Sequence, residues 1–232
     1  MVYVQEVLET MKTCILIPAH NESKEIAGII KDVRSYGLDI IVVDDGSTDN
    51  TAHIARENGA IVLGHKKNTG KGAALAKGFN YILKHDYDAA IAMDGDGQHL
   101  SEDIPGFLSR ATASKNSIFI GNRMRELKTM PWLRKMTNRT MSWVISSLAK
   151  QHIPDTQCGF RLYKREFMEK VGFSSLRFEA DSEVLIRAAH RGFKIESVPV
   201  KTVYNDHKSH INPFLDTLRF IRLLFRLWTT RN

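Results

Sequence analysis

Short apolar runs alternate with helical patterns through the first half of this 232-residue chain, and no other feature limits the possible folds as strongly. The apolar runs predicted to be strands are residues 14–17, 40–43, 60–63, 89–93 and 117–120. Helices are predicted between them over 22–35, 49–57 and 72–84, and from Ser101 or Asp103 onward. Strands separated by helices of about 10–15 residues form βαβ units. We therefore expect an α/β fold with a mostly parallel sheet flanked by helices.

Polar residues gather directly after four of the five predicted strands. The polar segments are His20–Glu22, Asp44–Asp49, Asp94–His99 and Gly121–Arg123. In open α/β sheets, ligands bind beyond the carboxyl ends of the strands, which lie at one edge of the sheet. We therefore expect these four segments to form one binding site.

Carboxylates are concentrated in this predicted site. Asp44, Asp45, Asp94 and Asp96 all lie within about two residues of a predicted strand end. Four acids close together repel one another, and a cation offsets that repulsion. A carboxylate-x-carboxylate element suits Mg²⁺ or Mn²⁺, which prefer oxygen ligands and are often shared with substrate phosphates. The pattern predicts a metal that is bound together with a nucleotide diphosphate.

Three familiar motifs for nucleotides or metals do not match the chain. No G-x-G-x-x-G follows the first strand, which disfavours a dinucleotide oxidoreductase. Gly70-Lys71-Gly72 resembles part of a P-loop, but His65 stands where its first glycine belongs and Gly72 where its Ser or Thr belongs. Residues 94–99 lack the glycine and terminal glutamate of an EF-hand at the required offsets.

Charge is divided unevenly along the chain. Residues 1–122 carry 12 basic and 16 acidic side chains, whereas residues 123–232 carry 21 basic and 10 acidic ones. The basic half indicates an anionic partner, which could be nucleic acid, a membrane surface or a phosphorylated substrate.

No apolar run reaches the ~18–20 residues of a membrane span, and residues 1–10 lack the apolar region of a secretory signal. Because the only cysteines are Cys14 and Cys158, we expect no disulfide, no cysteine-ligated metal and a cytoplasmic location.

The motifs, taken in order, resemble those of one enzyme family. The segments similar to GT-A inverting glycosyltransferases of family 2 are Ile17–Glu22, Val43–Asp49, Asn68–Gly72 and Asp94–His99. The segments similar to its polyprenyl-phosphate sugar synthases, of the dolichol-phosphate mannose synthase type, are Gly121–Arg123, Asp155–Arg161, Phe178–Glu183 and Val198–Val200. The resemblance covers residues 12–212 and implies a Rossmann-like GT-A catalytic domain over residues 1–212.

The resemblance also implies which residues bind the nucleotide sugar. The implied residues are Pro18, Asn21, Glu22, Asp45, Lys71, Asp94, Gln98, Asp155, Lys208 and Ser209. Asp45 would lie near the ribose or base. Asp94 and Asp96 would bind Mg²⁺ or Mn²⁺, with Gln98 as a third ligand. Lys208 and Ser209 match a basic-Ser-basic element over the diphosphate, in which His210 takes the third position here.

A second set of residues is implied to act in catalysis. These residues are Asp96, Arg123, Arg161, Glu179 and Asp181. Arg123 and Arg161 would contact phosphates. Glu179 and Asp181, together with Asp155, would lie in the sugar and acceptor region.

The chemistry of the acceptor decides which of these groups are needed. A lipid phosphate is already ionised at neutral pH, so its positioning by arginine matters more than a general base. A hydroxyl acceptor would instead require Asp181 or Glu179 as base.

We expect transfer of a hexose to polyprenyl phosphate with inversion, and GDP-mannose, UDP-glucose and UDP-N-acetylglucosamine remain open as donors. The alternatives are transfer to a glycan hydroxyl and a non-catalytic nucleotide- or nucleic-acid-binding module. Because the metal carboxylates and arginines are present, we disfavour that module and expect no nucleic-acid partner.

Two basic amphipathic helices are predicted in the second half. One follows Pro131 and carries an apolar stripe that includes Trp132, Met136 and Trp143, which suits a membrane interface, the protein core or a dimer interface equally. The other occupies residues 213–232 as a separate C-terminal element, with Arg219, Arg222 and Arg226 on one side. We expect it to bind the cytoplasmic face of a membrane or a membrane-spanning partner. A homo-oligomer is left open.

Overall fold

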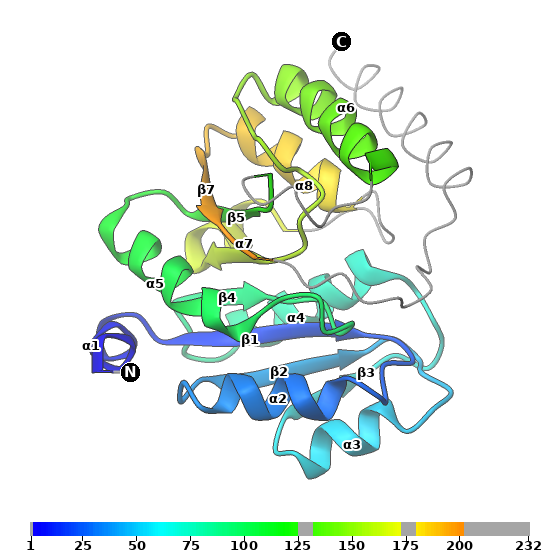
Figure 1. Ribbon diagram of the computed structural model, residues 1–232. Coiled ribbons are helices and arrows are strands. Elements are labelled where there is room, and N and C mark those ends of the chain that lie inside the picture. Colours follow the sequence, from blue (N-terminus) through cyan, green and yellow to red (C-terminus); the bar gives the residue numbers. More distant parts are fainter. Residues whose placement is uncertain (1, 125–131, 173–179, 202–232) are drawn as a thin grey trace.

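The computed structural model describes residues 2–124, 132–172 and 180–201 (Figure 1). The strands are β1 (Thr13–Ala19), β2 (Asp39–Asp44), β3 (Ile61–Gly64), β4 (Ala89–Ala92), β5 (Ile118–Asn122), β6 (Arg161–Lys164) and β7 (Ile195–Pro199). The α-helices are α1 (Val2–Thr10), α2 (Ile26–Arg34), α3 (Thr51–Glu57), α4 (Lys71–Leu83), α5 (Ile104–Ala113), α6 (Trp132–Ala149), α7 (Arg165–Lys170) and α8 (Ala180–His190). A short 3₁₀ helix, Ser101–Asp103, precedes α5.

The strands of the described residues form one sheet in the order β3-β2-β1-β4-β6-β5-β7. The first four strands in this order are parallel to one another, and β5 is parallel to β7. Only β6 is antiparallel to its neighbours, β4 and β5. Six strands therefore end at one edge of the sheet, and β6 begins at that same edge. The loop before β6 thus lies beside the loops after β1, β2, β4 and β5.

β1 and β4 are apolar along nearly their whole length because helices cover the sheet. Cys14, Ile15, Leu16 and Ile17 in β1 are fully buried, as is Ile91 in β4. Continuous apolar runs of this kind are typical of strands that are buried on both faces. The covering helices show the complementary pattern, since the buried residues of α2 are Ile26, Ile29, Ile30 and Val33.

The expected α/β architecture is confirmed. All five predicted strands form within a few residues of their expected bounds, and so do the helices α2, α3 and α4 and the helical region from Ser101 onward. The first strand runs further than expected, because Pro18 still pairs in register with Val43 at the end of β1. The elements that were not predicted are α1, β6, α7, α8 and β7.

Helix α6 turns inward a face other than the one that carries Trp132 and Trp143. Its buried residues include Asn138, Ser142 and Ile145, and it packs against α8 (Figure 1). Trp132 and Trp143 are 73% and 71% exposed. These two tryptophans are therefore not part of the protein core.

The remaining expectations about chain organisation are tested only in part. Cys14 and Cys158 are both buried free thiols, and burial raises the pKa of Cys158 to about 12. In the ranges that the structure describes, no helix combines the length and apolar character of a membrane span. The domain boundary at residue 212 and the helix expected over 213–232 lie outside those ranges.

Candidate active site

Four charged residues from four different elements form a continuous chain at the carboxyl edge of the sheet. Asp94 follows β4, Lys71 opens α4, Asp181 lies in the first turn of α8, and Arg161 begins β6. Lys71 Nζ lies 2.6 Å from Asp94 Oδ1 and 3.0 Å from Asp181 Oδ2. Asp181 Oδ1 lies 3.5 Å from Arg161 Nη1. Two carboxylates therefore alternate with two cations across the predicted site.

The surroundings of Lys71 and Asp94 strongly favour the charged form of each. Burial alone would lower the pKa of Lys71, but Asp181 and Asp94 raise it above its usual value. Burial alone would raise the pKa of Asp94, but Lys71 and His99 hold it well below its usual range. His99 Nε2 lies 3.2 Å from Asp94 Oδ2, so both carboxylate oxygens of Asp94 have a partner.

Asp96 and Glu22 differ from Asp94 because no cationic side chain of the described residues pairs with either of them. Asp96 is half-buried, and its Oδ1 accepts a hydrogen bond from the Gln98 backbone N–H at 3.0 Å. Burial and the charges of Asp96 and Asp94 raise the pKa of Glu22 to about 7. This acidic cluster has an unbalanced negative charge that a bound cation would offset.

The residues present fit a divalent cation that is shared with a substrate. The described residues contain no group of three or more His, Cys, Asp or Glu side chains arranged to hold a metal on their own. Mg²⁺ usually takes only one or two carboxylates and completes its octahedron with water and substrate phosphates. Asp94 and Asp96 supply that number of carboxylates, with oxygen as the preferred ligand type.

The raised pKa of Glu22 predicts a pH-dependent loss of stability in metal-free protein. Between the usual value of 4.5 and about 7, the folded state keeps a proton that the unfolded state releases, so stability falls as pH rises through this window. Glu22→Gln removes this loss. We expect the variant to melt above the wild type at pH 8 in EDTA, and the two melting temperatures to converge at pH 4. Glu57→Gln, an exposed position on α3, is the control. A Glu22→Gln difference that is the same at both pH values would contradict the prediction.

Asn21 and Asp45 mainly connect loops in this structure. The Asn21 side-chain oxygen accepts the backbone N–H of Thr48 at 2.8 Å. Asp45 is 4% exposed, and its carboxylate accepts hydrogen bonds from Thr69 Oγ1 at 2.6 Å and from the backbone N–H of Gly70 at 2.6 Å. Burial acts to raise the pKa of Asp45, but these bonds and one from His65 lower it below its usual value. The oxygens of Asp45 are thus engaged by the 65–70 loop in this structure, and its place near a ribose or base stays a prediction.

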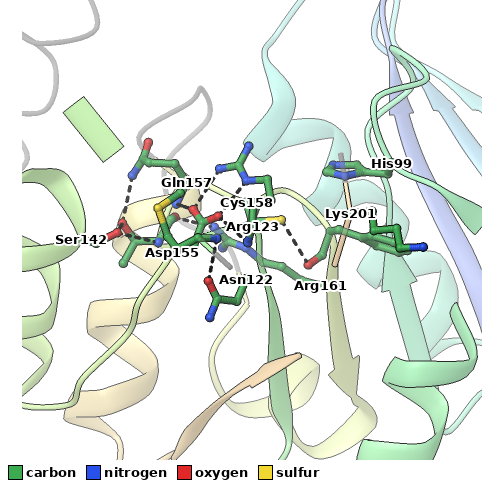
Figure 2. A network of polar contacts seen from close by, with 12 residues as sticks. His99, Asn122, Arg123, Ser142, Asp155, Gln157, Cys158, Arg161 and Lys201 are labelled. Atoms are coloured by element: carbon green, nitrogen blue, oxygen red, sulfur yellow. Dashed lines mark hydrogen bonds and ion pairs between the residues drawn. The ribbon is translucent and has the colours of Figure 1, made fainter. Parts of the chain in front are cut away.

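Asp155 fixes the side chain of Arg123. Arg123 donates from Nε to Asp155 Oδ2 at 2.7 Å and from Nη2 to Asp155 Oδ1 at 2.9 Å (Figure 2). Asp155 is fully buried beneath Arg123, and its contact with the nucleotide sugar stays a prediction. A two-point contact of this kind sets both the position and the plane of the guanidinium group. Arg123 itself lies at the end of β5 with a side chain that is 11% exposed.

Arg161 is also engaged by the protein itself. Its side chain is fully buried, and its guanidinium donates to the backbone carbonyls of Cys158, Asp181 and Thr156 at 2.7, 2.9 and 3.0 Å. Since these bonds use donors on all three of its nitrogens, Arg161 does not present a surface to a phosphate. It instead holds the loop before β6 against the start of α8.

The backbone passes very close to the Lys71–Asp94 pair at Gly159. A Cβ atom at this position would lie 2.7 Å from Lys71 Nζ and 2.8 Å from Asp94 Cγ. We expect Gly159→Ala to cost about 1–3 kcal/mol of unfolding free energy and to displace the ion pair, which urea denaturation and nucleotide-binding titration would measure. At Gly28, an exposed position on α2, an added Cβ meets nothing within 4 Å. Gly28→Ala should therefore be neutral or stabilising by up to about 1 kcal/mol. If Gly159→Ala and Gly28→Ala had the same effect on unfolding free energy and nucleotide binding, the close approach of Gly159 to the ion pair would be refuted.

Several of the predicted binding residues lie at the carboxyl edge of the sheet, as expected. Others fall outside the described ranges. Pro18, Gln98 and Lys71 are half-buried at the carboxyl edge, in or directly after the elements expected. Glu179, Lys208 and Ser209, together with His210, fall outside the described residues.

Ser142 is a site-supporting residue that the sequence reasoning missed. Its Oγ accepts the backbone N–H of Thr156 at 3.0 Å, next to the Asp155 that holds Arg123 (Figure 2). Ser142 is 5% exposed, and Asn138 one turn before it is 7% exposed. Two polar residues spaced by four on the buried side of a helix were the available signal, because buried polar groups need specific partners.

The fold is shared with a solved structure. Glucosyl-3-phosphoglycerate synthase of Mycobacterium tuberculosis, in a structure with Mn²⁺, UDP and phosphoglyceric acid, aligns over 98% of this chain and 81% of its own. The TM-score is 0.74 at 17% sequence identity, which shows a shared fold. The architecture is thus that of the GT-A glycosyltransferases.

Sequence comparison gives the family. The model of glycosyl transferase family 2 matches residues 14–172, and the chain belongs to this family. One relative is the UDP-N-acetylglucosamine–dolichyl-phosphate N-acetylglucosaminyltransferase of Methanococcus voltae, which is 30% identical over 83% of this chain and 86% of the relative. Polyprenol monophosphomannose synthase of Mycolicibacterium smegmatis is 29% identical over 82% of this chain and 77% of the relative. The expected resemblance and the assignment as a glycosyltransferase are confirmed.

Proposed function

We propose that the protein transfers a hexose from a nucleotide-diphosphate sugar to a polyprenyl phosphate, with inversion and with the help of a divalent metal. Relatives that cover most of the chain carry names with dolichyl-phosphate or polyprenol acceptors. The resemblance of the Gly121–Arg123 and Asp155–Arg161 segments supports the same acceptor class. Both lines of support concern the acceptor. The sugar and the nucleotide base of the donor remain open.

The observation that carries the proposal is the environment of Asp181. Its carboxylate lies between Lys71 Nζ at 3.0 Å and Arg161 Nη1 at 3.5 Å, and the side chain is 14% exposed. A general base must place an oxygen within hydrogen-bond reach of the acceptor's proton, and both carboxylate oxygens of Asp181 already lie beside these two cations. A hydroxyl acceptor needs such a base, whereas a phosphate acceptor is already ionised. The geometry of Asp181 therefore favours the phosphate.

Asp94 and Asp96 would hold Mg²⁺ or Mn²⁺, with Gln98 as a third ligand. The ion, when bound, acts as a Lewis acid that neutralises charge on the departing diphosphate. Lys71 keeps Asp94 ionised and in place through its 2.6 Å ion pair. Arg123, oriented by Asp155, would position the acceptor phosphate, and positioning is the larger task when the nucleophile is already charged.

We also propose that the enzyme works at the cytoplasmic face of a membrane. The support is the lipid-linked acceptor, the basic second half of the chain and the two free cysteines. The C-terminal element 213–232, as a membrane or partner contact, remains part of this proposal.

Replacing Asp181 tests whether it acts as a base. For a phosphate acceptor, we expect Asp181→Asn to lower kcat by no more than about tenfold, through the loosened Lys71, whereas loss of a general base typically costs about 10²–10⁴-fold. The measurement is kcat against pH for the wild type and the variant. Disappearance of an acid-side limb from the pH profile, with a loss of more than about 10²-fold, would show that Asp181 is the base.

The proposed reaction is tested directly by a panel of donors. Purified protein is incubated with short polyprenyl phosphate, Mg²⁺ and each of GDP-mannose, UDP-glucose and UDP-N-acetylglucosamine, labelled in the sugar. We expect label in the lipid extract with one donor. Label that stays in the aqueous phase with every donor would reject the proposal.

A further inference from the structure

Large exposed apolar side chains of the described residues are concentrated on one helix. Trp132, Met136 and Trp143 of α6 are 73%, 47% and 71% exposed. The fourth such residue, Ile61, is 37% exposed and lies on β3, the strand at the opposite edge of the sheet from β7. Single exposed apolar residues need no explanation, but two tryptophans and a methionine on one helix indicate an interaction surface.

These three side chains lie on one face of α6. At about 100° per residue, Trp132, Met136 and Trp143 fall within about 40° of arc. The two tryptophans are separated by about three turns, or about 16 Å along the helix axis. The other face is buried at Ser142 and Ile145, among others, and α6 packs against α8. The exposed face therefore has no role in holding the described fold together.

The positive charge of α6 and of the residue after it indicates an anionic partner. Residues 132–150 contain four basic residues, Arg134, Lys135, Arg139 and Lys150, and no Asp or Glu. Arg139 is exposed and lies about 20° from Trp132 around the helix. Tryptophan has an apolar ring and a polar N–H group, so it is enriched where hydrocarbon meets lipid headgroups. Basic side chains beside it are attracted to anionic lipids.

We infer that the outward face of α6, formed by Trp132, Met136, Arg139 and Trp143, docks on an anionic lipid bilayer. The inference rests on the proposed function, because an enzyme with a polyprenyl-phosphate acceptor meets that acceptor at a bilayer surface. A helix that lies in the interface inserts its apolar side chains among the headgroups and keeps its basic groups near the lipid phosphates.

The opposite face of the same helix is connected to the proposed site for the acceptor phosphate. Ser142 on this face accepts the Thr156 backbone N–H at 3.0 Å, and the neighbouring Asp155 holds Arg123 in its two-point contact. The docking face and the arginine are thus joined through one helix and one loop. This arrangement would bring the arginine close to the bilayer surface from which the acceptor comes.

The double variant Trp132→Ser/Trp143→Ser tests the docking surface, with Ile61→Ser as the matched control. The readout is co-sedimentation with phosphatidylglycerol-containing vesicles that lack polyprenyl phosphate. We expect binding of the double variant to fall at least about tenfold, while the control binds like the wild type. Transfer to a short, water-soluble polyprenyl phosphate should stay at the wild-type rate, and transfer to a long-chain acceptor in vesicles should fall.

The outcomes separate the docking surface from the proposed reaction. Unchanged co-sedimentation of the double variant would overturn the inference. It would also be overturned if the wild type proved to be a dimer that the double variant dissociates with no change in vesicle binding. If the wild type transfers no sugar to the short acceptor but vesicle binding still depends on the two tryptophans, the proposed function fails and the docking surface stands.

Discussion

Asp96→Ala should lower sugar transfer by at least about 10²-fold and remove the effect of Mg²⁺ on nucleotide binding. Asp96 belongs to an acidic cluster in which no described cationic side chain pairs with it, and it lies two residues from the Asp94 that Lys71 holds. If a metal offsets this cluster and the diphosphate together, loss of Asp96 removes one of two carboxylate ligands. Calorimetric titration of the nucleotide diphosphate, with Mg²⁺ and with EDTA, measures binding separately from turnover.

Asp86→Ala is the matched control for this prediction. Asp86 is exposed and lies before β4, at the opposite end of the strand from Asp96. The control should keep wild-type turnover and a Mg²⁺-dependent affinity. Full turnover in purified Asp96→Ala, or nucleotide binding that still responds to Mg²⁺, would exclude Asp96 as a ligand.

Arg161→Met should destabilise the fold by about 3–5 kcal/mol, the usual cost of breaking a buried ion pair. The substitution removes the fully buried donors to the Cys158, Thr156 and Asp181 carbonyls and leaves the half-buried Asp181 side chain with only Lys71 as cationic partner among the described residues. Urea denaturation measures the loss. Arg56→Met, at an exposed position on α3, should change the unfolding free energy by no more than about 0.5 kcal/mol.

A conservative variant separates structure from catalysis at Arg161. Arg161→Lys keeps the positive charge beside Asp181 but cannot reach three carbonyl groups from one planar group, so most of the destabilisation should remain. A fully stable Arg161→Met that has lost activity would instead support the expectation that Arg161 contacts phosphate.

The sequence predicted well those elements whose own residues show how deeply they are buried. β1, β2 and β4 are buried on both faces, so their apolar runs stand out from the helices between them. β6 was missed because two of its four residues, Arg161 and Lys164, are charged, and the burial of Arg161 depends on carbonyls from distant segments. β7 was missed because Glu196 and Ser197 interrupt its apolar residues.

In the candidate site, too, contacts between residues far apart in sequence were not predicted. The expectation that polar segments meet at one edge was correct, because the carboxyl ends of parallel strands share that edge. The contacts that individual site residues make within the protein were not predictable: Asp45, Asp155 and Arg161, for which motif likeness implies ligand contacts, are also buried and hydrogen-bonded within the protein. The ion pairs of Lys71 join residues far apart in sequence, and only the folded chain brings them together.

The most direct test of the central claim compares two acceptors that differ only in their phosphate. The full chain is given the donor that the panel selects, Mg²⁺ and either a polyprenyl phosphate or the polyprenol of the same length. We predict sugar label in the lipid product with the phosphate and none above background with the alcohol. Equal or greater labelling of the alcohol, or labelling of neither, would contradict the assignment of a phosphate acceptor.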